Sequence, residues 1–215
     1  GFSFESALLD AIMILREGAA RQLLVGGLDE ITPFSQAILQ RFDLYKANPG
    51  NNLALLQSKT KGTIAGEGAA FFVLGAEKGS HTTACLAGVQ TIYKPQDTAA
   101  VQRATALFLE AHGLQAADID LLLTGRNGDV DDDQWYYHWA TTLFAGKPEA
   151  AFKHLCGEYP TAAGFGMWLG ANVLAHRQVP AEIMFAGQAP AKINNILMYN
   201  HHAATHHSLI LITVC

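Results

Sequence analysis

Apolar positions recur at helical spacing in some stretches of the chain and form short continuous runs in others. Over residues 2–18, apolar side chains return every three or four positions, which predicts a helix that Ser3 caps and Gly18 ends. The apolar run 22–25 is closed by two glycines, and such a run is typical of a strand buried on both faces. The chain is therefore expected to begin with a helix and a buried strand.

The remaining pattern predicts further strands and helices in alternation. Helices are expected over residues 33–42, 97–112, 132–144 and 161–176, and strands over 69–74, 83–91, 119–123, 151–153, 195–199 and 208–214. Asp97 is expected to cap the second of these helices, and Asp132 the third. Surface loops are expected at 44–61 and at the histidine-rich segment 200–207. This order predicts a layered α/β fold with helices on both faces of a sheet.

Composition and charge narrow the possible classes of function. Half of the 215 residues are apolar and only 15% are charged, which is enough apolar surface for a substantial core. The formal net charge of −5 argues against a nucleic-acid binder, because a surface that follows phosphates needs a basic excess. No apolar run approaches the ~20 residues of a membrane span, and the first residues lack the pattern of a signal peptide.

The cysteines suggest a compartment rather than a site. Cys85, Cys156 and Cys215 are too scattered for a zinc site or a Cys-x-x-Cys pair. Their odd number suits free thiols in a reducing environment, so we expect three free cysteines and a cytoplasmic protein. No pattern in the sequence predicts a cofactor.

The segment 153–166 is where the chemistry of the chain is expected to converge. A lysine, Lys153, and a short turn containing Gly157 lead into a helix that begins with small residues. Small residues at the start of a helix let other backbone approach closely, and the free N–H groups there attract an anion or a polarised oxygen. Glu158 lies inside this turn and is the central candidate residue.

Four segments, in the same order along the chain, resemble the β-ketoacyl-[acyl carrier protein] synthases of the thiolase-like fold. They cover residues 2–27, 66–74, 113–123 and 153–164. The resemblance implies a thiolase-like α-β-α-β-α layering with an incomplete N-terminal half. Residues 1–79 would be the remainder of that half, and residues 80–215 the C-terminal half. The nucleophilic cysteine of the family would fall at or just before the first residue, so no residue is assigned to it.

The resemblance also places the catalytic positions of the family on this sequence. In that family a cysteine thiolate accepts the acyl chain, two histidines polarise the malonyl thioester, and a lysine holds the network. Lys153 matches the lysine, whereas the two histidine positions fall on Thr124 and Glu158. The glycine-rich final loop of the family, which surrounds the substrate pocket, corresponds here to a segment that includes His201, His202, Ala203 and Ala204.

Two hypotheses follow from these substitutions. An anion at Glu158 opposes a transition state that builds negative charge, so the resemblance favours a catalytically silent chain-length-factor-like subunit in fatty acid or polyketide (polyene) biosynthesis. Its expected partners are an acyl carrier protein and either an active synthase subunit or a second copy. The alternative is an active 3-oxoacyl-[acyl carrier protein] synthase or acyltransferase with a rewired site. Glu158 would then need a pKa raised by burial, with His202 or His154 supplying the imidazole.

The histidine-rich segment suggests a third hypothesis, a metal-binding module. Its candidate ligands are His201, His202, His206 and His207. Adjacent histidines in an extended segment point in opposite directions, and no carboxylate lies inside it, so a hydrogen-bonded loop is favoured. The acidic run 129–133 lacks calcium-loop spacing and is expected to be a solvated turn. Arg126 is expected either to form an ion pair beside this run or to plug the would-be active site.

Overall fold

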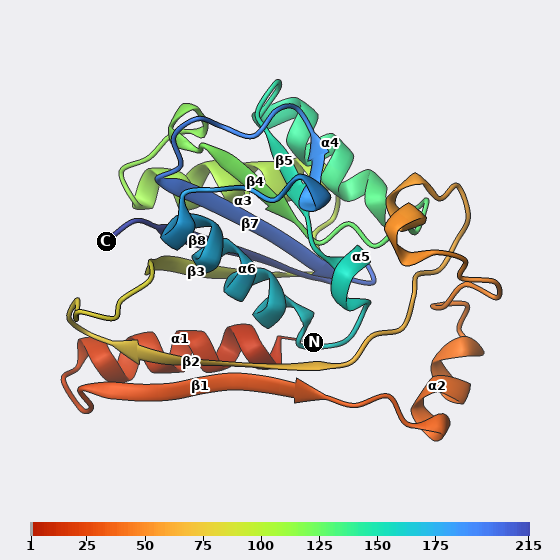
Figure 1. Cartoon of the computed structure of the whole chain (residues 1–215), viewed down its shortest axis with the longest axis horizontal. Helices are drawn as coiled ribbons and strands as arrows, with labels where there is room; N and C mark the ends of the chain where they lie inside the picture. Colours follow the sequence, from red (N-terminus) through yellow and green to blue (C-terminus); the bar gives the residue numbers. More distant parts are fainter. Residues whose placement is uncertain (1) are drawn as a thin grey trace.

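The strands form two separate sheets. The computed structural model describes residues 2–215. Six strands form a mixed sheet in the order β3-β8-β7-β4-β5-β6, and β1 pairs with β2 in an antiparallel two-stranded sheet (Figure 1). The strands are β1 Gln22–Asp29, β2 Gly68–Gly75, β3 Cys85–Tyr93, β4 Leu121–Thr124, β5 Glu149–Ala151, β6 Met184–Ala186, β7 Asn195–His202 and β8 His206–Thr213.

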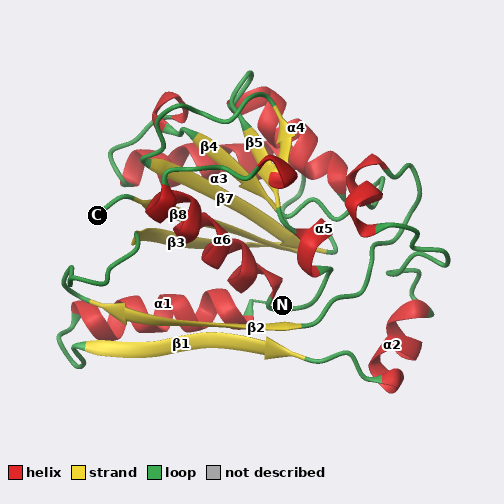
Figure 2. Cartoon of the chain, viewed as in Figure 1, coloured by secondary structure: helices red, strands yellow, loops and turns green. Residues whose placement is uncertain are grey.

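Four of the α-helices form two layers: α1 and α6 lie between the sheets, and α3 and α4 lie outside the larger sheet (Figure 2). α1 and α6 contact strands of both sheets, whereas α3 packs on α4 and β3. The α-helices are α1 Ser3–Arg16, α2 Pro33–Gln40, α3 Thr98–Ala111, α4 Asp133–Leu143, α5 Lys153–Cys156 and α6 Ala162–His176. Three short 3-10 helices are η1 Asn52–Gln57, η2 Ala116–Asp118 and η3 Ala181–Ile183. This layering confirms the predicted α/β fold with helices on both faces of a sheet.

Alternation along the central strands divides the core into two clusters. Leu121 and Leu123 face the layer of α1 and α6, and Leu122 between them faces α3 and α4. All three side chains are almost completely buried, as are most residues of β7 and β8. Because both faces of these strands are covered, their sequences are continuously apolar rather than alternating.

Small residues allow α6 to lie close to the large sheet. A Cβ atom added at Gly166 would lie 2.7 Å from the sulfur of Met198 and 2.9 Å from Phe152. A Cβ atom at Gly170 would lie 2.9 Å from Ile212. The small-residue pattern therefore serves close helix–sheet packing.

The first strand differs from its prediction. β1 continues through its two glycines to Asp29 and pairs only with β2. Leu24 and Leu28 are 71% and 70% exposed, so burial on both faces is wrong for this strand. Phe71 and Val73 of β2 are exposed on the same face, which no part of residues 2–215 covers. An apolar run predicts the strand, but it does not reveal which faces are covered.

Several local predictions are also corrected. The predicted loop 200–207 is instead the tip of a hairpin, because β7 and β8 extend through its histidines. The side chain of Asp97 caps α3 by accepting a hydrogen bond from the Ala100 N–H at 2.7 Å, as predicted. Neither Ser3 nor Asp132 provides a side-chain cap for its helix. The short elements β6 and α5 were not predicted, because their sequences are too short to show a periodic apolar pattern.

The cysteine prediction is wrong for two of the three residues. Cys85 and Cys215 form a disulfide that joins the start of β3 to the residues following β8, and only Cys156 is a free thiol. The two cysteines are 130 positions apart in sequence, and only the pairing of β3 with β8 brings them together. Within residues 2–215, no helix combines the length and apolar character needed to cross a membrane.

Removing the disulfide should lower the stability of the protein. A cross-link restricts the unfolded chain, so we expect Cys85→Ala combined with Cys215→Ala to lower the free energy of unfolding by about 2–4 kcal/mol. Urea unfolding of the oxidised protein and of the double variant measures this difference. Cys156→Ala is the control for the loss of a cysteine side chain. Identical unfolding midpoints for the oxidised protein and the double variant would contradict the prediction.

Candidate functional site

The candidate site lies at the carboxyl ends of three neighbouring strands of the large sheet. β4 lies parallel to both β5 and β7, so the residues that follow these strands meet at one edge. Thr124 is the last residue of β4, Lys153 begins α5 shortly after β5, and His202 ends β7. This edge is where ligands commonly bind in α/β sheets with parallel strands.

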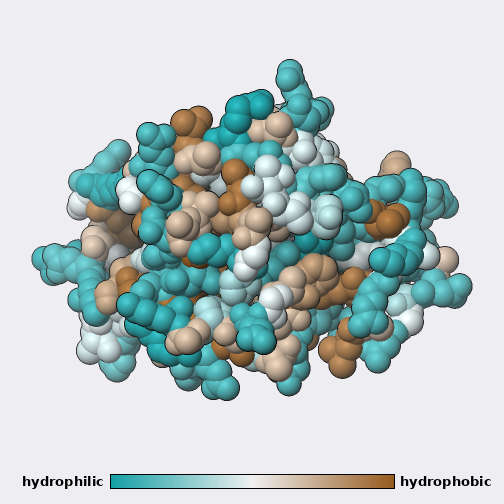
Figure 3. Space-filling model, turned by 90° about the horizontal axis from the view of Figure 1, so that it is seen from above, coloured by the Kyte–Doolittle hydropathy of each residue, from teal (hydrophilic) through white to brown (hydrophobic). Residues whose placement is uncertain are grey.

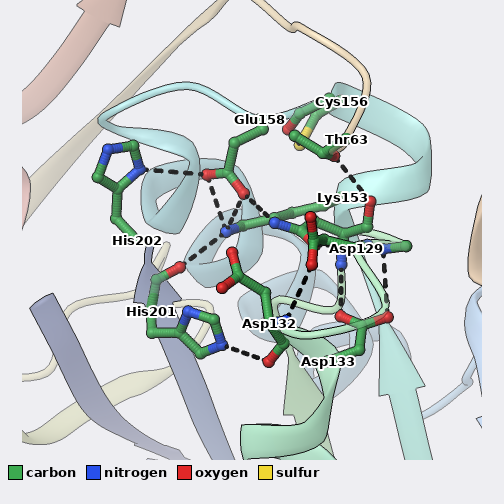
Figure 4. Close-up of polar contacts among 12 residues, drawn as sticks. Thr63, Asp129, Asp132, Asp133, Lys153, Cys156, Glu158, His201 and His202 are labelled. Carbon is green, nitrogen blue, oxygen red and sulfur yellow. Dashed lines mark hydrogen bonds and ion pairs between the residues drawn. The ribbon is translucent and has the colours of Figure 1, made fainter. Parts of the chain in front are cut away.

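A buried ion pair between Lys153 and Glu158 is the centre of the site (Figure 4). The Lys153 Nζ atom lies 2.7 and 2.9 Å from the two carboxylate oxygens of Glu158, and it also donates to the His201 carbonyl at 3.1 Å. The Asn127 amide donates to Glu158 at 2.8 Å, and His202 Nδ1 lies 3.7 Å from its other oxygen. The Lys153 side chain is completely buried.

The surroundings of Glu158 keep it ionised. Burial alone would raise its pKa, but the charge of Lys153 and the polar contacts of His202, Lys153 and Asn127 outweigh burial and lower the pKa to about 2. A carboxylate with such a pKa is a weak base near neutral pH. The raised pKa that the rewired-enzyme hypothesis requires is therefore contradicted.

Thr124 belongs to a second buried group beside the first. Its hydroxyl donates to Glu149 at 2.8 Å, and the Nε atom of Arg126 lies 2.6 Å from the same carboxylate oxygen. Arg126 also donates to the Asp133 carbonyl at 3.3 Å and lies 4.2 Å from the centre of the Phe185 ring. Its ion pair is thus with Glu149, which the sequence reasoning missed. A glutamate in an otherwise apolar short strand was the available signal for a buried pair.

The acidic run forms a folded turn rather than a solvated one. Asp133 accepts hydrogen bonds from the backbone N–H groups of Asn127 and Gly128 at 3.0 and 3.2 Å. This contact fixes Asn127, which in turn holds the central carboxylate. Burial, followed by repulsion from Asp129, raises the pKa of Asp132 to about 6, and Lys153 opposes that rise. Of the aspartates in this run, only Asp131 is exposed to solvent as predicted.

The four histidines of the hairpin form two cross-strand pairs on opposite faces. The inner pair is His201 with His207, and the outer pair is His202 with His206. Within the inner pair, His201 Nε2 donates to the Asp132 carbonyl at 3.0 Å and its ring stacks on Tyr136. Burial, followed by the charge of Lys153, holds the pKa of His201 well below its ordinary value, so this imidazole is neutral.

The positions of the four hairpin histidines do not support the hypothesis of a metal-binding module. Within residues 2–215, no three histidine, cysteine, aspartate or glutamate side chains are arranged to hold a metal ion. His154 is not an acid–base partner for the central carboxylate either, because its Nε2 atom donates to the Glu182 carbonyl at 3.0 Å. Burial raises the pKa of the Cys156 thiol to about 12, which leaves it protonated and unreactive.

Two residues of the hairpin turn adopt a backbone conformation that favours glycine, although neither is a glycine. Ala203 and Ala204 have φ angles of 48° and 47°, and the Thr205 N–H donates to the His202 carbonyl at 3.1 Å. Two successive residues with positive φ form the turn that usually contains Asn-Gly. The resemblance places these alanines in the glycine-rich loop of the family, and both alanines have the positive φ angles that favour glycine.

Glycine at the second position of the turn should stabilise the protein. A β-carbon is unfavourable at positive φ, so Ala204→Gly is expected to raise the free energy of unfolding by about 0.5–1 kcal/mol. Ala204→Val should lower it, because a β-branched side chain tolerates this region worse still. Urea unfolding at pH 7 measures both variants. A loss of stability in Ala204→Gly would contradict the observed turn geometry.

Neutralising Glu158 should destabilise the protein strongly at neutral pH. Glu158→Gln leaves the Lys153 ammonium buried without its counter-charge, so we expect a loss of about 3–5 kcal/mol. The carboxylate has a pKa of about 2 in the folded state and an ordinary value of 4.5. Its contribution is therefore complete above pH 4.5 and is lost as the pH falls through about 2.

Urea unfolding between pH 7 and pH 2 measures this contribution. The difference between the wild type and Glu158→Gln should shrink toward the acid end of that range. Glu77→Gln is the matched control, because Glu77 is exposed. If Glu158→Gln and Glu77→Gln lowered the free energy of unfolding by the same small amount at pH 7, the ion pair would contribute nothing to stability.

Comparison with solved structures identifies the fold. The ishigamide ketosynthase/chain length factor has a TM-score of 0.80 at 15% sequence identity, over 99% of this chain and 59% of its own. A type II polyketide synthase acyl-carrier protein in complex with its ketosynthase bound to the hexaketide has a TM-score of 0.80 at 16% identity, over 100% of this chain and 61% of its own. A β-ketoacyl synthase from Burkholderia phymatum STM815 has a TM-score of 0.74 at 17% identity, over 100% and 60%.

The chain thus spans about three fifths of the length of these solved structures. No protein-family model matches the sequence. No curated protein matches it either. The predicted thiolase-like fold is confirmed by structures whose sequences differ from this one at most positions.

Proposed function

We propose that this chain, which has the fold of the ketosynthases, is a catalytically silent subunit of the chain-length-factor kind. In this proposal it acts in fatty acid or polyketide (polyene) biosynthesis, where it pairs with an active synthase and limits the growth of the acyl chain. The observation that carries the proposal is the buried ion pair of Lys153 and Glu158 at the site where a synthase would need a neutral imidazole.

The chemistry of decarboxylative condensation supports this assignment. The reaction builds negative charge on a thioester oxygen, so its catalyst needs hydrogen-bond donors directed at that oxygen. Glu158 has no proton to donate at neutral pH, because its pKa is about 2. The hydroxyl of Thr124 already donates to Glu149. Neither residue can replace a histidine that polarises a thioester.

Exposed apolar surface on α2 supports a role in pairing. None of the eight residues of α2 is buried, and Phe34 and Ile38, four positions apart on one side, are 77% and 39% exposed. An isolated helix of fewer than ~12 residues is marginally stable in water without a packed face. We infer that this ridge packs against the partner subunit. The side of the molecule seen from above is mainly hydrophilic with small separate hydrophobic spots (Figure 3).

The domain assignment is part of the same proposal. Residues 1–79 would belong to the first thiolase-like half and residues 80–215 to the second. The two-stranded sheet with an exposed apolar face, which includes Leu24 and Phe71, suits a half-domain completed by further strands and helices. An acyl carrier protein is the proposed third component, since one of the similar structures contains one.

Co-expression of this protein in its full-length form with a candidate active synthase and its carrier protein tests the proposal. Native mass spectrometry should show a complex of the two subunits, and product analysis should show elongation only when the active synthase is present. Phe34→Ala should weaken the complex or change the product length, because it truncates the proposed contact. Leu107→Ala on α3 is the matched control, with a side chain that is also largely exposed.

One result would contradict the proposal directly. A homodimer of this protein that elongates acyl chains without any partner would show that the site is active. Glu158 and His202 would then be the residues whose roles need a different explanation.

A further inference from the structure

A long segment, residues 44–66, crosses the candidate site and is called the strap below. It leaves α2, passes beside α5 and returns to β2 (Figure 1). The Thr63 hydroxyl donates to the Asn127 carbonyl at 2.7 Å, and the Asn52 amide donates to the His154 carbonyl at 2.9 Å. Leu55 lies against Gly128, where an added Cβ atom would collide with it.

The strap also holds the backbone of the central carboxylate. The Glu158 N–H donates to the Ile64 carbonyl at 2.8 Å, and the Gly66 N–H donates to the Glu158 carbonyl at 3.0 Å. One end of the strap thus fixes the backbone of Glu158, while Thr63 fixes the residue that donates to its side chain. The position of Glu158 therefore depends on the strap remaining in place.

The ammonium group of Lys46 joins three parts of this arrangement. Its Nζ atom lies 3.0 Å from both the carbonyl and the hydroxyl oxygen of Thr60, 3.4 Å from the Lys61 carbonyl and 2.9 Å from the Gly128 carbonyl. The first three oxygens belong to the strap, and the fourth belongs to the turn that follows β4. Lys46 thus closes the strap on itself and attaches it to the turn next to Asn127.

The ligands of this ammonium group are unusual for a lysine. Within residues 2–215, Lys46 forms no ion pair with a carboxylate, and its four oxygen contacts are three carbonyls and one hydroxyl. Backbone carbonyl oxygens replace the hydration shell of a monovalent cation in ion-selective sites. Burial lowers the pKa of Lys46, and the charges of Asp129 and Asp133 oppose that effect.

We propose that the oxygens of Thr60, Lys61 and Gly128 form a monovalent-cation site that the Lys46 ammonium fills, and that this tethered cation is the positioning device for the strap over Glu158. The ligand class is a weakly hydrated monovalent cation of ammonium or potassium size. This inference is independent of the proposed function, because the cage would hold the strap equally in a silent and in an active protein.

Shortening the side chain should turn the tethered cation into a dissociable one. We expect Lys46→Ala to speed backbone hydrogen exchange at Gly66 and Glu158 by about tenfold or more in lithium chloride, because the strap opens locally more often. Ammonium or potassium chloride at the same ionic strength should restore most of the protection, since the salts screen surface charges equally but only these ions fit the cage. Two-dimensional NMR measures the exchange.

Two controls separate the cage from general effects of charge and salt. Lys59→Ala removes an exposed charge from the same strap at a residue that contributes no oxygen to the cage, and exchange in this variant should not depend on the identity of the cation. Lys46→Met keeps the aliphatic part of the side chain without the charge and should show the same ion selectivity as Lys46→Ala. It also serves as the test protein if Lys46→Ala does not fold.

Two outcomes would overturn the proposal. Unchanged exchange at Gly66 and Glu158 in both Lys46 variants would show that the ammonium does not hold the strap. Faster exchange that is equal in lithium, potassium and ammonium chloride would show that the oxygens form no cation site. Selective recovery in potassium and ammonium chloride is the result that supports it.

Discussion

The polar structure of the site depends on one buried charge pair. The Lys153 ammonium is completely buried, and removing such a charge from water is costly unless a counter-charge and hydrogen bonds replace the water. Glu158 supplies the counter-charge, and the His201 carbonyl accepts the remaining hydrogen bond. A neutral histidine at position 158 could not balance this lysine in the same way. A glutamate at this position therefore determines the electrostatics of the whole site.

The elements around the pair are arranged to hold it. Asp133 fixes the backbone of Asn127, Asn127 donates to the carboxylate, and the strap binds the backbone of Glu158. Of these contacts, the Asn127 hydrogen bond stabilises the ionised form directly and thus opposes its use as a general base. In the neighbouring ion pair, Arg126 and Glu149 likewise balance each other's charge. The charges of these two ion pairs are balanced internally, which supports the structural role proposed above.

The sequence predicted most of the strands, the main helices and the thiolase-like layering because periodic apolar patterns and ordered motif segments carry that information. It did not predict the partner of Arg126, since Glu149 is 23 positions away and only the pairing of β4 with β5 brings them together. The Cys85–Cys215 disulfide was missed for the same reason. The pKa of Glu158 was misjudged in the rewired-enzyme hypothesis because burial and ion pairing act in opposite directions. Only the geometry shows which one prevails.

Direct titration of Glu158 tests the central claim most sharply. Carbon-13 NMR of the glutamate side-chain carboxyl groups, with the resonance assigned by its absence in Glu158→Gln, follows the ionisation of this single group. We expect a titration midpoint near 2, because the Lys153 ion pair and the hydrogen bonds outweigh burial. A midpoint above the ordinary value of 4.5 would contradict it, since the carboxyl group would then be positioned to exchange a proton near neutral pH.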